Sequence, residues 1–241
     1  MWRNAVITTG QPKTALTENF ETLQKQSFSV DNGVVRKVRE QAEGVIEETA
    51  ARFGLQQFPF PPGPAPKKGW KKANRAKAWK KAFNDHDSGV WMLPDGFVRE
   101  PFGTQASPDF VFIFGKQLIF IDIKSSKDGR PTLNDNLPAR NTIYVFASSK
   151  LSRFTFAQGS DLVSEAMRGL QAEYWNELRR VGASMNAKRP SGESAEFGWR
   201  KCFTFNSNPF SDKILGLDRV TREDRVLQRL VTIGSNLTTV S

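Results

Sequence analysis

The chain has 241 residues, of which 38% are apolar, with 19 Phe, 6 Trp and a formal net charge of +10. This size and apolar content exclude a disordered chain and allow a sizeable core. Cys202, the single cysteine, excludes an internal disulfide, and no apolar run approaches the roughly 18 residues that a membrane span needs. The N-terminus lacks the apolar stretch of a signal peptide, so we expect a cytoplasmic protein.

The positive charge is concentrated in one segment. Residues 1–60 carry seven basic and seven acidic side chains, which cancel, whereas residues 61–84 carry eight basic side chains and no acidic one. A concentrated positive segment attracts a polyanion, and nucleic acid is the commonest one. An acidic membrane is the competing partner, but the segment lacks the bulky apolar face of an interfacial helix.

The first clear element is an amphipathic helix over 34–53. Its apolar side chains recur at steps of three and four residues, and Gly54 marks its expected end. The segment 59–66 contains five prolines and can form neither a helix nor a central strand. It predicts an extended spacer that leads into the basic segment.

The basic segment itself predicts a short helix within 69–83. Trp79 and Phe83 share one stripe of this helix and are expected to dock it, with the lysines facing outward. An ordinary solvated charged face is the alternative interpretation. The side chains that we expect to contact DNA from this segment are Lys71, Lys72, Lys80 and Lys81.

The strongest local pattern is a β-hairpin. Residues 110–114 and 118–124 are apolar runs of strand length, and Gly115-Lys116 between them predicts a tight turn. Side chains alternate along a strand, so the second run divides into two faces. One face carries Ile119, Ile121 and Ile123, and the other carries Leu118, Phe120, Asp122 and Lys124.

The remaining elements complete an α/β (α+β) domain with a central mixed sheet flanked by helices. They are a strand over 142–146, a helix over 162–181, a strand over 197–205 and a helix that opens at Thr221. Ser160 or Asp161 is expected to cap the helix over 162–181, and residues 84–87 are expected to form a loop.

Three charged residues meet at one end of the hairpin. Asp109 opens the first strand directly after Pro108, and Asp122 and Lys124 close the second strand on one face. Folding at the turn returns Asp122 beside Asp109. Two carboxylates that converge with one lysine form a small site for a hard divalent cation and an activated water. A salt bridge between Asp122 and Lys124, with Asp109 as a turn cap, is the structural alternative.

These residues resemble the PD-(D/E)xK nuclease superfamily. The resemblance rests on Ser107-Pro108-Asp109 and Asp122-Ile123-Lys124, with twelve residues between the two acids and Asp in place of the commoner Glu. It implies a restriction-endonuclease-like core that binds Mg²⁺, with Mn²⁺ as a substitute. The implied metal ligands are Asp109, Asp122 and the carbonyl of Ile123, and Lys124 would orient the attacking water. The family often adds an acid from a preceding helix; Glu47 and Glu48 are candidates, Glu43 a weaker one.

The resemblance implies a type II restriction enzyme, which cleaves double-stranded DNA at specific sites. A nonspecific, repair or junction-processing nuclease is one alternative, and a non-catalytic DNA-binding protein is another. No nucleotide-binding motif is present, so we expect no nucleotide cofactor. A prokaryotic or phage-like origin and a homodimer are consistent with this class. We expect one domain over 1–241, with the spacer and basic segment at 59–84 and the catalytic core in 34–58 and 85–181.

The loop over 125–141 leaves directly from the predicted catalytic strand. Its Arg and Asn side chains suit base edges in the major groove, and Ser126 and Lys127 suit phosphate. An ordinary exposed loop is the alternative. The other loop side chains expected to contact DNA are Arg130, Asn134, Asn136, Arg140 and Asn141.

Overall fold

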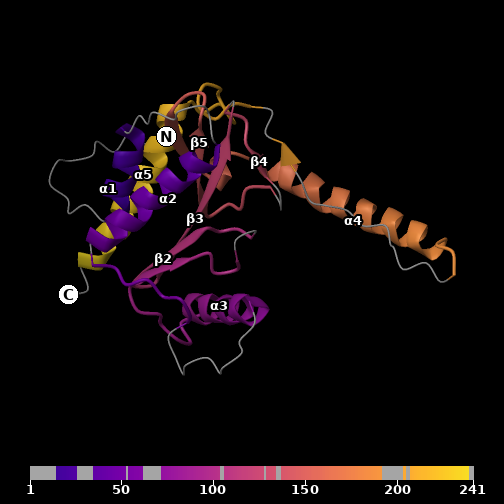
Figure 1. The fold of residues 1–241 in the computed structure, drawn as a ribbon, viewed down its shortest axis with the longest axis horizontal. Helices are drawn as coiled ribbons and strands as arrows, with labels where there is room; N and C mark the ends of the chain where they lie inside the picture. The colour runs from indigo at the N-terminus through magenta and orange to yellow at the C-terminus, as the bar shows by residue number, and fades with distance from the viewer. Residues whose placement is uncertain are drawn as a thin grey trace.

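A computed structural model describes most of the chain. The described residues are 15–25, 35–52, 54–61, 72–103, 106–127, 129–133, 137–191, 203–204 and 207–238. Five strands form one mixed sheet with helices around it, which confirms the α+β class (Figure 1). Its strands are β1 (Gly96–Arg99), β2 (Phe110–Phe114), β3 (Gln117–Ser126), β5 (Thr142–Ser148) and β6 (Arg153–Gln158).

The strand order is β1-β2-β3-β5-β6, and only β3 and β5 run parallel. The predicted hairpin is confirmed: β2 and β3 pair antiparallel from Phe110 opposite Ile121 to Phe114 opposite Gln117. Gly115 turns the chain with a φ of 54°, a conformation that favours glycine. A separate short ladder joins β4 (Thr132–Leu133) to β7 (Phe203–Thr204).

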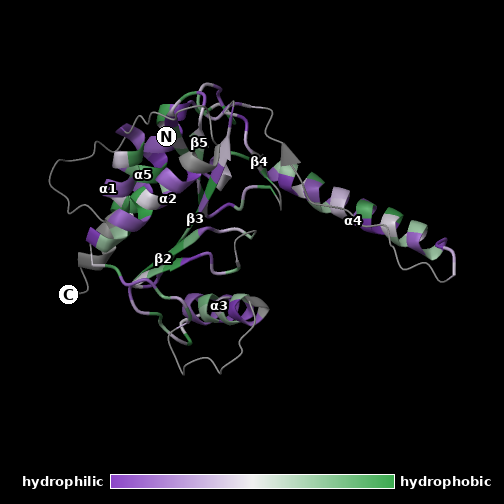
Figure 2. Cartoon of the chain, viewed as in Figure 1, coloured by the Kyte–Doolittle hydropathy of each residue, from purple (hydrophilic) through white to green (hydrophobic). Residues whose placement is uncertain are grey.

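Three helices cover one face of the sheet. They are α1 (Ala15–Lys25), α2 (Val35–Arg52) and α5 (Arg219–Thr238). Alternate strand residues, including Phe112, Ile121 and Val145, form the main core with these helices. In Figure 2, β2 is green, the hydrophobic end of the scale, over much of its length, whereas α2 shows both purple and green residues. The predicted helix over 34–53 is confirmed, and Gly54 follows it with a φ of 69°.

The opposite face of the sheet carries two smaller apolar clusters. Near β2, helix α3 (Lys72–Asp87) packs through the buried Trp79 and Phe83, as predicted. Near β5 and β6, Tyr144 and Phe146 pack with side chains from the connections that follow β4 and β6. Strand β3 runs between the strands that carry these two clusters. Near its end, Asp122 and Lys124 alternate with the core residues Ile121 and Ile123 and therefore lie on this face of the sheet.

Several element boundaries differ from the predictions. Residues 84–87 are the last turn of α3 rather than a loop, because His86 is buried and its Nδ1 accepts a hydrogen bond from the backbone N–H of Leu93 at 3.0 Å. Strand β6 was not predicted. Helix α4 (Glu165–Ala187) is capped by Ser164, because residues 159–161 form a separate 3-10 turn. Helix α5 begins two residues before Thr221.

Candidate active site

Asp109 is held against the end of β3. It lies one residue before β2, and one further step of the β2–β3 register places it opposite Asp122. The backbone N–H of Ile123 donates to Oδ2 of Asp109 at 2.7 Å. Since the N–H and C=O of one strand residue point to the same edge, the carbonyl of Ile123 also faces the Asp109 side. The predicted convergence of the two acids is therefore present in the fold.

Lys124 lies directly beside Asp122. Its Nζ is 3.0 Å from Oδ1 and 2.8 Å from Oδ2 of that carboxylate. The Asp122 side chain is 2% exposed and that of Lys124 is 21% exposed, so the pair is largely removed from water. Removing two charges from water costs free energy, and the attraction between them offsets this cost only in part. The pair is therefore not explained by a gain in stability alone.

The environment of Asp109 makes its carboxylate hard to ionise. Burial and the charge of Asp122 raise the pKa of Asp109 to about 6, although the Ile123 N–H and the Arg39 guanidinium act in the opposite direction. Arg39 Nη2 donates to Oδ1 of Asp109 at 2.6 Å. Asp109 thus remains hard to ionise even beside a guanidinium. A further positive charge at this position would stabilise its ionised form.

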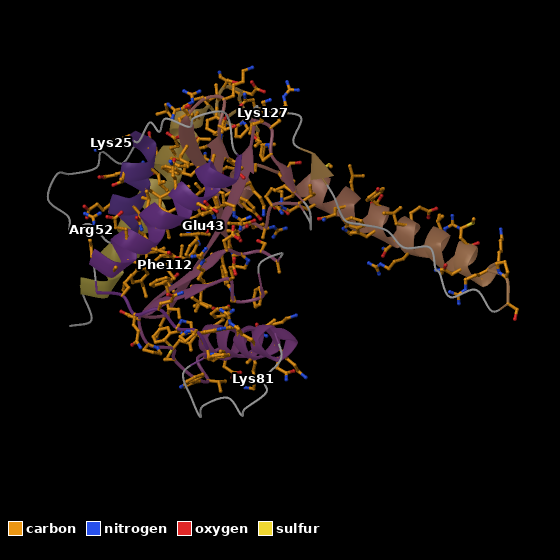
Figure 3. The ribbon with its side chains drawn as sticks, viewed as in Figure 1. Lys25, Glu43, Arg52, Lys81, Phe112 and Lys127 are labelled. Atoms are coloured by element: carbon orange, nitrogen blue, oxygen red, sulfur yellow. The ribbon has the colours of Figure 1, made fainter. Side chains whose placement is uncertain are left out.

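A chain of alternating charges leads from Asp109 onto α2. Arg39 also donates through Nε to Glu43 at 2.8 Å, and Glu43 accepts from Arg99 at 2.6 Å. Arg99 in turn donates to Glu47 at 2.6 Å. Figure 3 shows Glu43 between α2 and the sheet. The helix acid nearest the carboxylate pair along this chain is thus Glu43.

Glu47, the helix acid predicted for the site, is paired with Arg99 at 2.6 Å. Three charged side chains, Arg39, Glu43 and Arg99, lie between it and Asp109 along this chain of contacts. Within the described ranges, no group of three or more His, Cys, Asp or Glu side chains could hold a metal ion. Glu48 is exposed.

Tyr144 stands beside Asp122 on the neighbouring strand, as its register partner. Its hydroxyl accepts a hydrogen bond from the backbone N–H of Ala139 at 2.9 Å and interacts with the Ser107 side chain. Burial, followed by the charge of Asp122, raises the pKa of Tyr144. Tyr144 therefore ties the segment that leads into Asp109 to the loop that precedes β5.

The donor set suits a hard divalent cation. Two neighbouring carboxylates and a backbone carbonyl are oxygen ligands, which Mg²⁺ prefers, and Mg²⁺ usually keeps several waters rather than a full protein cage. Burial, followed by the charge of Asp122, raises the pKa of Asp109, and a cation bound between the two acids would counter both effects. Asp109, Asp122 and the carbonyl of Ile123 are the groups that would hold it.

The predicted DNA contacts lie on both sides of this site. On α3, Lys80 and Lys81 are exposed, and Lys81 is paired with Asp85. At the other end Lys127 is exposed just after β3, and Figure 3 shows it far from Lys81. Ser126 belongs to β3, and its Oγ accepts from the Gly129 N–H.

The remaining predicted contacts are only partly placed by the structure. Arg130, Arg140 and Asn141 are exposed, and Arg140 forms an ion pair with Glu165. Lys72 begins α3, but its side chain is outside the description. Lys71, Asn134 and Asn136 lie outside the described residues, as do Cys202 and most of the strand predicted over 197–205.

Arg39, Arg99 and Tyr144 were not predicted as site residues. Arg39 and Glu43 have the four-residue spacing of a helix ion pair, which is the only signal that the sequence offers for either arginine. The contact between Arg39 and Asp109 joins residues 70 positions apart, and no local pattern encodes it.

Comparison with known proteins gave no match to a family model, a curated protein or a solved structure. In the described part of the chain, no helix combines the length and apolar character needed to cross a membrane.

Proposed function

We propose that this chain is a magnesium-dependent DNA endonuclease, of the site-specific type II restriction class, that hydrolyses phosphodiester bonds at the Asp109–Asp122–Lys124 site. The observation that carries the proposal is the convergence of two buried carboxylates and one ammonium group at a single strand end. An ordinary surface salt bridge has no need for a second buried acid, and the second acid makes the site less stable without a cation.

The chemistry follows from the charges at the site. A bound Mg²⁺ would supply Lewis-acid polarisation of the phosphate. Lys124 orients the attacking water and offsets negative charge on the phosphate, while Asp122 holds the Lys124 ammonium in place. The attacking water gives up one proton to solvent as its oxygen bonds to phosphorus, the bond to the leaving oxygen breaks, and that oxygen takes up one proton from solvent. Arg39 supports Asp109 from α2.

The positive surface supports DNA as the substrate. The net charge of +10 attracts a polyanion, and the exposed lysines of α3 and Lys127 lie on opposite sides of the site. A duplex that contacts both would pass over the carboxylate pair.

The decisive experiment is digestion of a supercoiled plasmid of known sequence with Mg²⁺ and with EDTA. Asp122→Asn and Lys124→Ala are expected to lower the cleavage rate by at least about 10²–10³-fold, because each removes a group that stabilises the transition state. Binding of a DNA fragment, measured by gel shift, should change little.

Matched controls are Asp87→Asn and Lys116→Ala, which alter exposed residues away from the site. Discrete fragments support a site-specific enzyme, and a smear supports a nonspecific or repair nuclease. Full cleavage by Asp122→Asn would refute the site. A gel shift without cleavage by the native chain would favour the second candidate, a non-catalytic DNA-binding protein, in which Arg39 and Lys124 merely neutralise the two acids.

A further inference from the structure

Helix α4 extends away from the rest of the molecule. It has 23 residues, a length of about 34 Å, and Figure 1 shows it projecting beyond the sheet. Among the described elements, none packs extensively along it. Its attachment is at the N-terminal end, where Arg168 donates to the carbonyls of Pro138 and Gly159 and Ser164 caps the first turn.

The projecting helix carries an exposed apolar seam. At 100° per residue, six apolar side chains spaced by three or four residues fall within about a quarter of the helix circumference. Leu170 is 57% exposed, Tyr174 52% and Val181 44%, whereas the flanking Trp175 and Gly182 are buried. The seam consists of Met167, Leu170, Tyr174, Leu178, Val181 and Met185.

The spacing of this seam matches that of paired helices. Five of its members, together with the polar Gln171 between Met167 and Tyr174, follow steps of four, three, four, three and four residues, which keep one stripe facing a partner helix over about 27 Å. Leu170 lies beside this stripe. The steps of the stripe read the same in both directions, so a second copy of α4 offers a stripe of matching spacing.

Charge also favours a second copy over other partners. Two copies of a chain with a net charge of +10 repel each other over most of their surface. Residues 165–187, however, contain three acidic and three basic side chains, so α4 is neutral. Glu177 and Arg180 already form an ion pair within the helix. The neutral, apolar α4 is poorly suited to a phosphate backbone but well suited to its own copy.

We infer that two copies of this chain associate through the α4 seams, forming a two-fold dimer. Two helices paired along the seam bury on the order of 1,000 Å² in total, which is about the minimum for a biological interface. A self-complementary patch is what a two-fold interface requires. This inference does not depend on the proposed nuclease activity.

The test is the mass of the full chain in solution, measured by analytical ultracentrifugation at micromolar concentrations. The native chain is expected at twice 27.1 kDa. Tyr174→Glu/Val181→Glu places two carboxylates in the seam and is expected to sediment at the mass of one chain. The matched control Asn176→Glu/Ala183→Glu adds the same charges at the same spacing on the opposite, exposed face and should remain dimeric.

Leu170→Ala/Val181→Ala, which adds no charge, is expected to raise the dimer Kd at least about tenfold. Circular dichroism confirms that each variant keeps its helix content. A native chain that sediments as a monomer, or a seam variant that remains dimeric, would overturn the inference.

Discussion

At the scale of single residues, the environment of Asp109 sets the electrostatics of the site. Its carboxylate accepts from Arg39 and from the Ile123 N–H, yet burial and Asp122 still raise its pKa to about 6. The unfolded value is about 3.9. The folded chain therefore binds a proton more readily than the unfolded chain between these two pH values, and stability falls as pH rises through this window.

We therefore expect Asp109→Asn to gain stability relative to the native chain as pH rises from 4.5 to 7.5 in EDTA. The expected change in the difference of unfolding free energies is about 2 kcal/mol, since one pKa unit corresponds to about 1.36 kcal/mol and this pH range covers most of the titration. Urea unfolding at both pH values measures it. Loss of the Arg39 contact in the variant lowers its unfolding free energy by the same amount at pH 4.5 and at pH 7.5. A stability difference between variant and native chain that does not vary with pH would therefore contradict the raised pKa of Asp109. Asp87→Asn is the exposed control.

The sequence allowed the two acids and the lysine of the site to be predicted, but not the arginine that contacts Asp109. Asp109, Asp122 and Lys124 could be placed together because strand alternation and a two-residue turn determine the register of a hairpin. The sequence offers three basic residues near the start of α2, Arg36, Lys37 and Arg39. It could not show that Arg39 reaches Asp109, because that contact depends on how α2 lies across the sheet.

At the scale of elements, the local sequence pattern predicted whether a segment forms a helix or a strand better than it predicted which side chains of that element are buried. Strands β2 and β3 were predicted because every residue of β2 is apolar and β3 has the apolar run 118–121 near its start. Strand β6 was missed because its buried Thr155 reads as polar, and its hydroxyl is satisfied by Glu223, 68 positions later. Helix α4 was predicted from apolar periodicity, but that periodicity does not reveal that its seam is exposed.

Helix α3 has a buried aromatic face and an exposed basic face. Its exposed lysines can therefore be replaced without disturbing the packing of the helix, which allows its contact with DNA to be tested. We predict that Lys77→Gln/Lys80→Gln weakens binding and lowers the slope of log K against log salt by about 2, since each phosphate contact contributes about 0.9. Fluorescence anisotropy at several salt concentrations measures the slope.

The control is Lys25→Gln/Arg52→Gln, which removes two charges from the helices on the other face of the sheet (Figure 3). An α3 variant whose salt slope equals that of the native chain would show that this helix does not contact DNA.

At the scale of the whole molecule, the proposed site and the proposed dimer interface lie in different parts of the fold. The carboxylate pair is at the end of β3, whereas the α4 seam projects away from the sheet. The sequence indicated a basic α+β domain, but the outward direction of α4 depends on tertiary contacts of Arg168 that no pattern encodes. Because the two features are separate, association can be removed without altering the site.

If both proposals hold, pairing supplies one site for each strand of a duplex. The native chain is then expected to convert supercoiled plasmid mainly to the linear form. Tyr174→Glu/Val181→Glu should accumulate the nicked circle and form linear DNA at least about tenfold more slowly, because each strand requires a separate encounter. Agarose gels over a time course measure the three forms, and Asn176→Glu/Ala183→Glu should behave like the native chain. Equal nicked intermediates from the seam variant and the native chain would mean that α4 pairing does not couple the two cuts, even where each proposal stands alone.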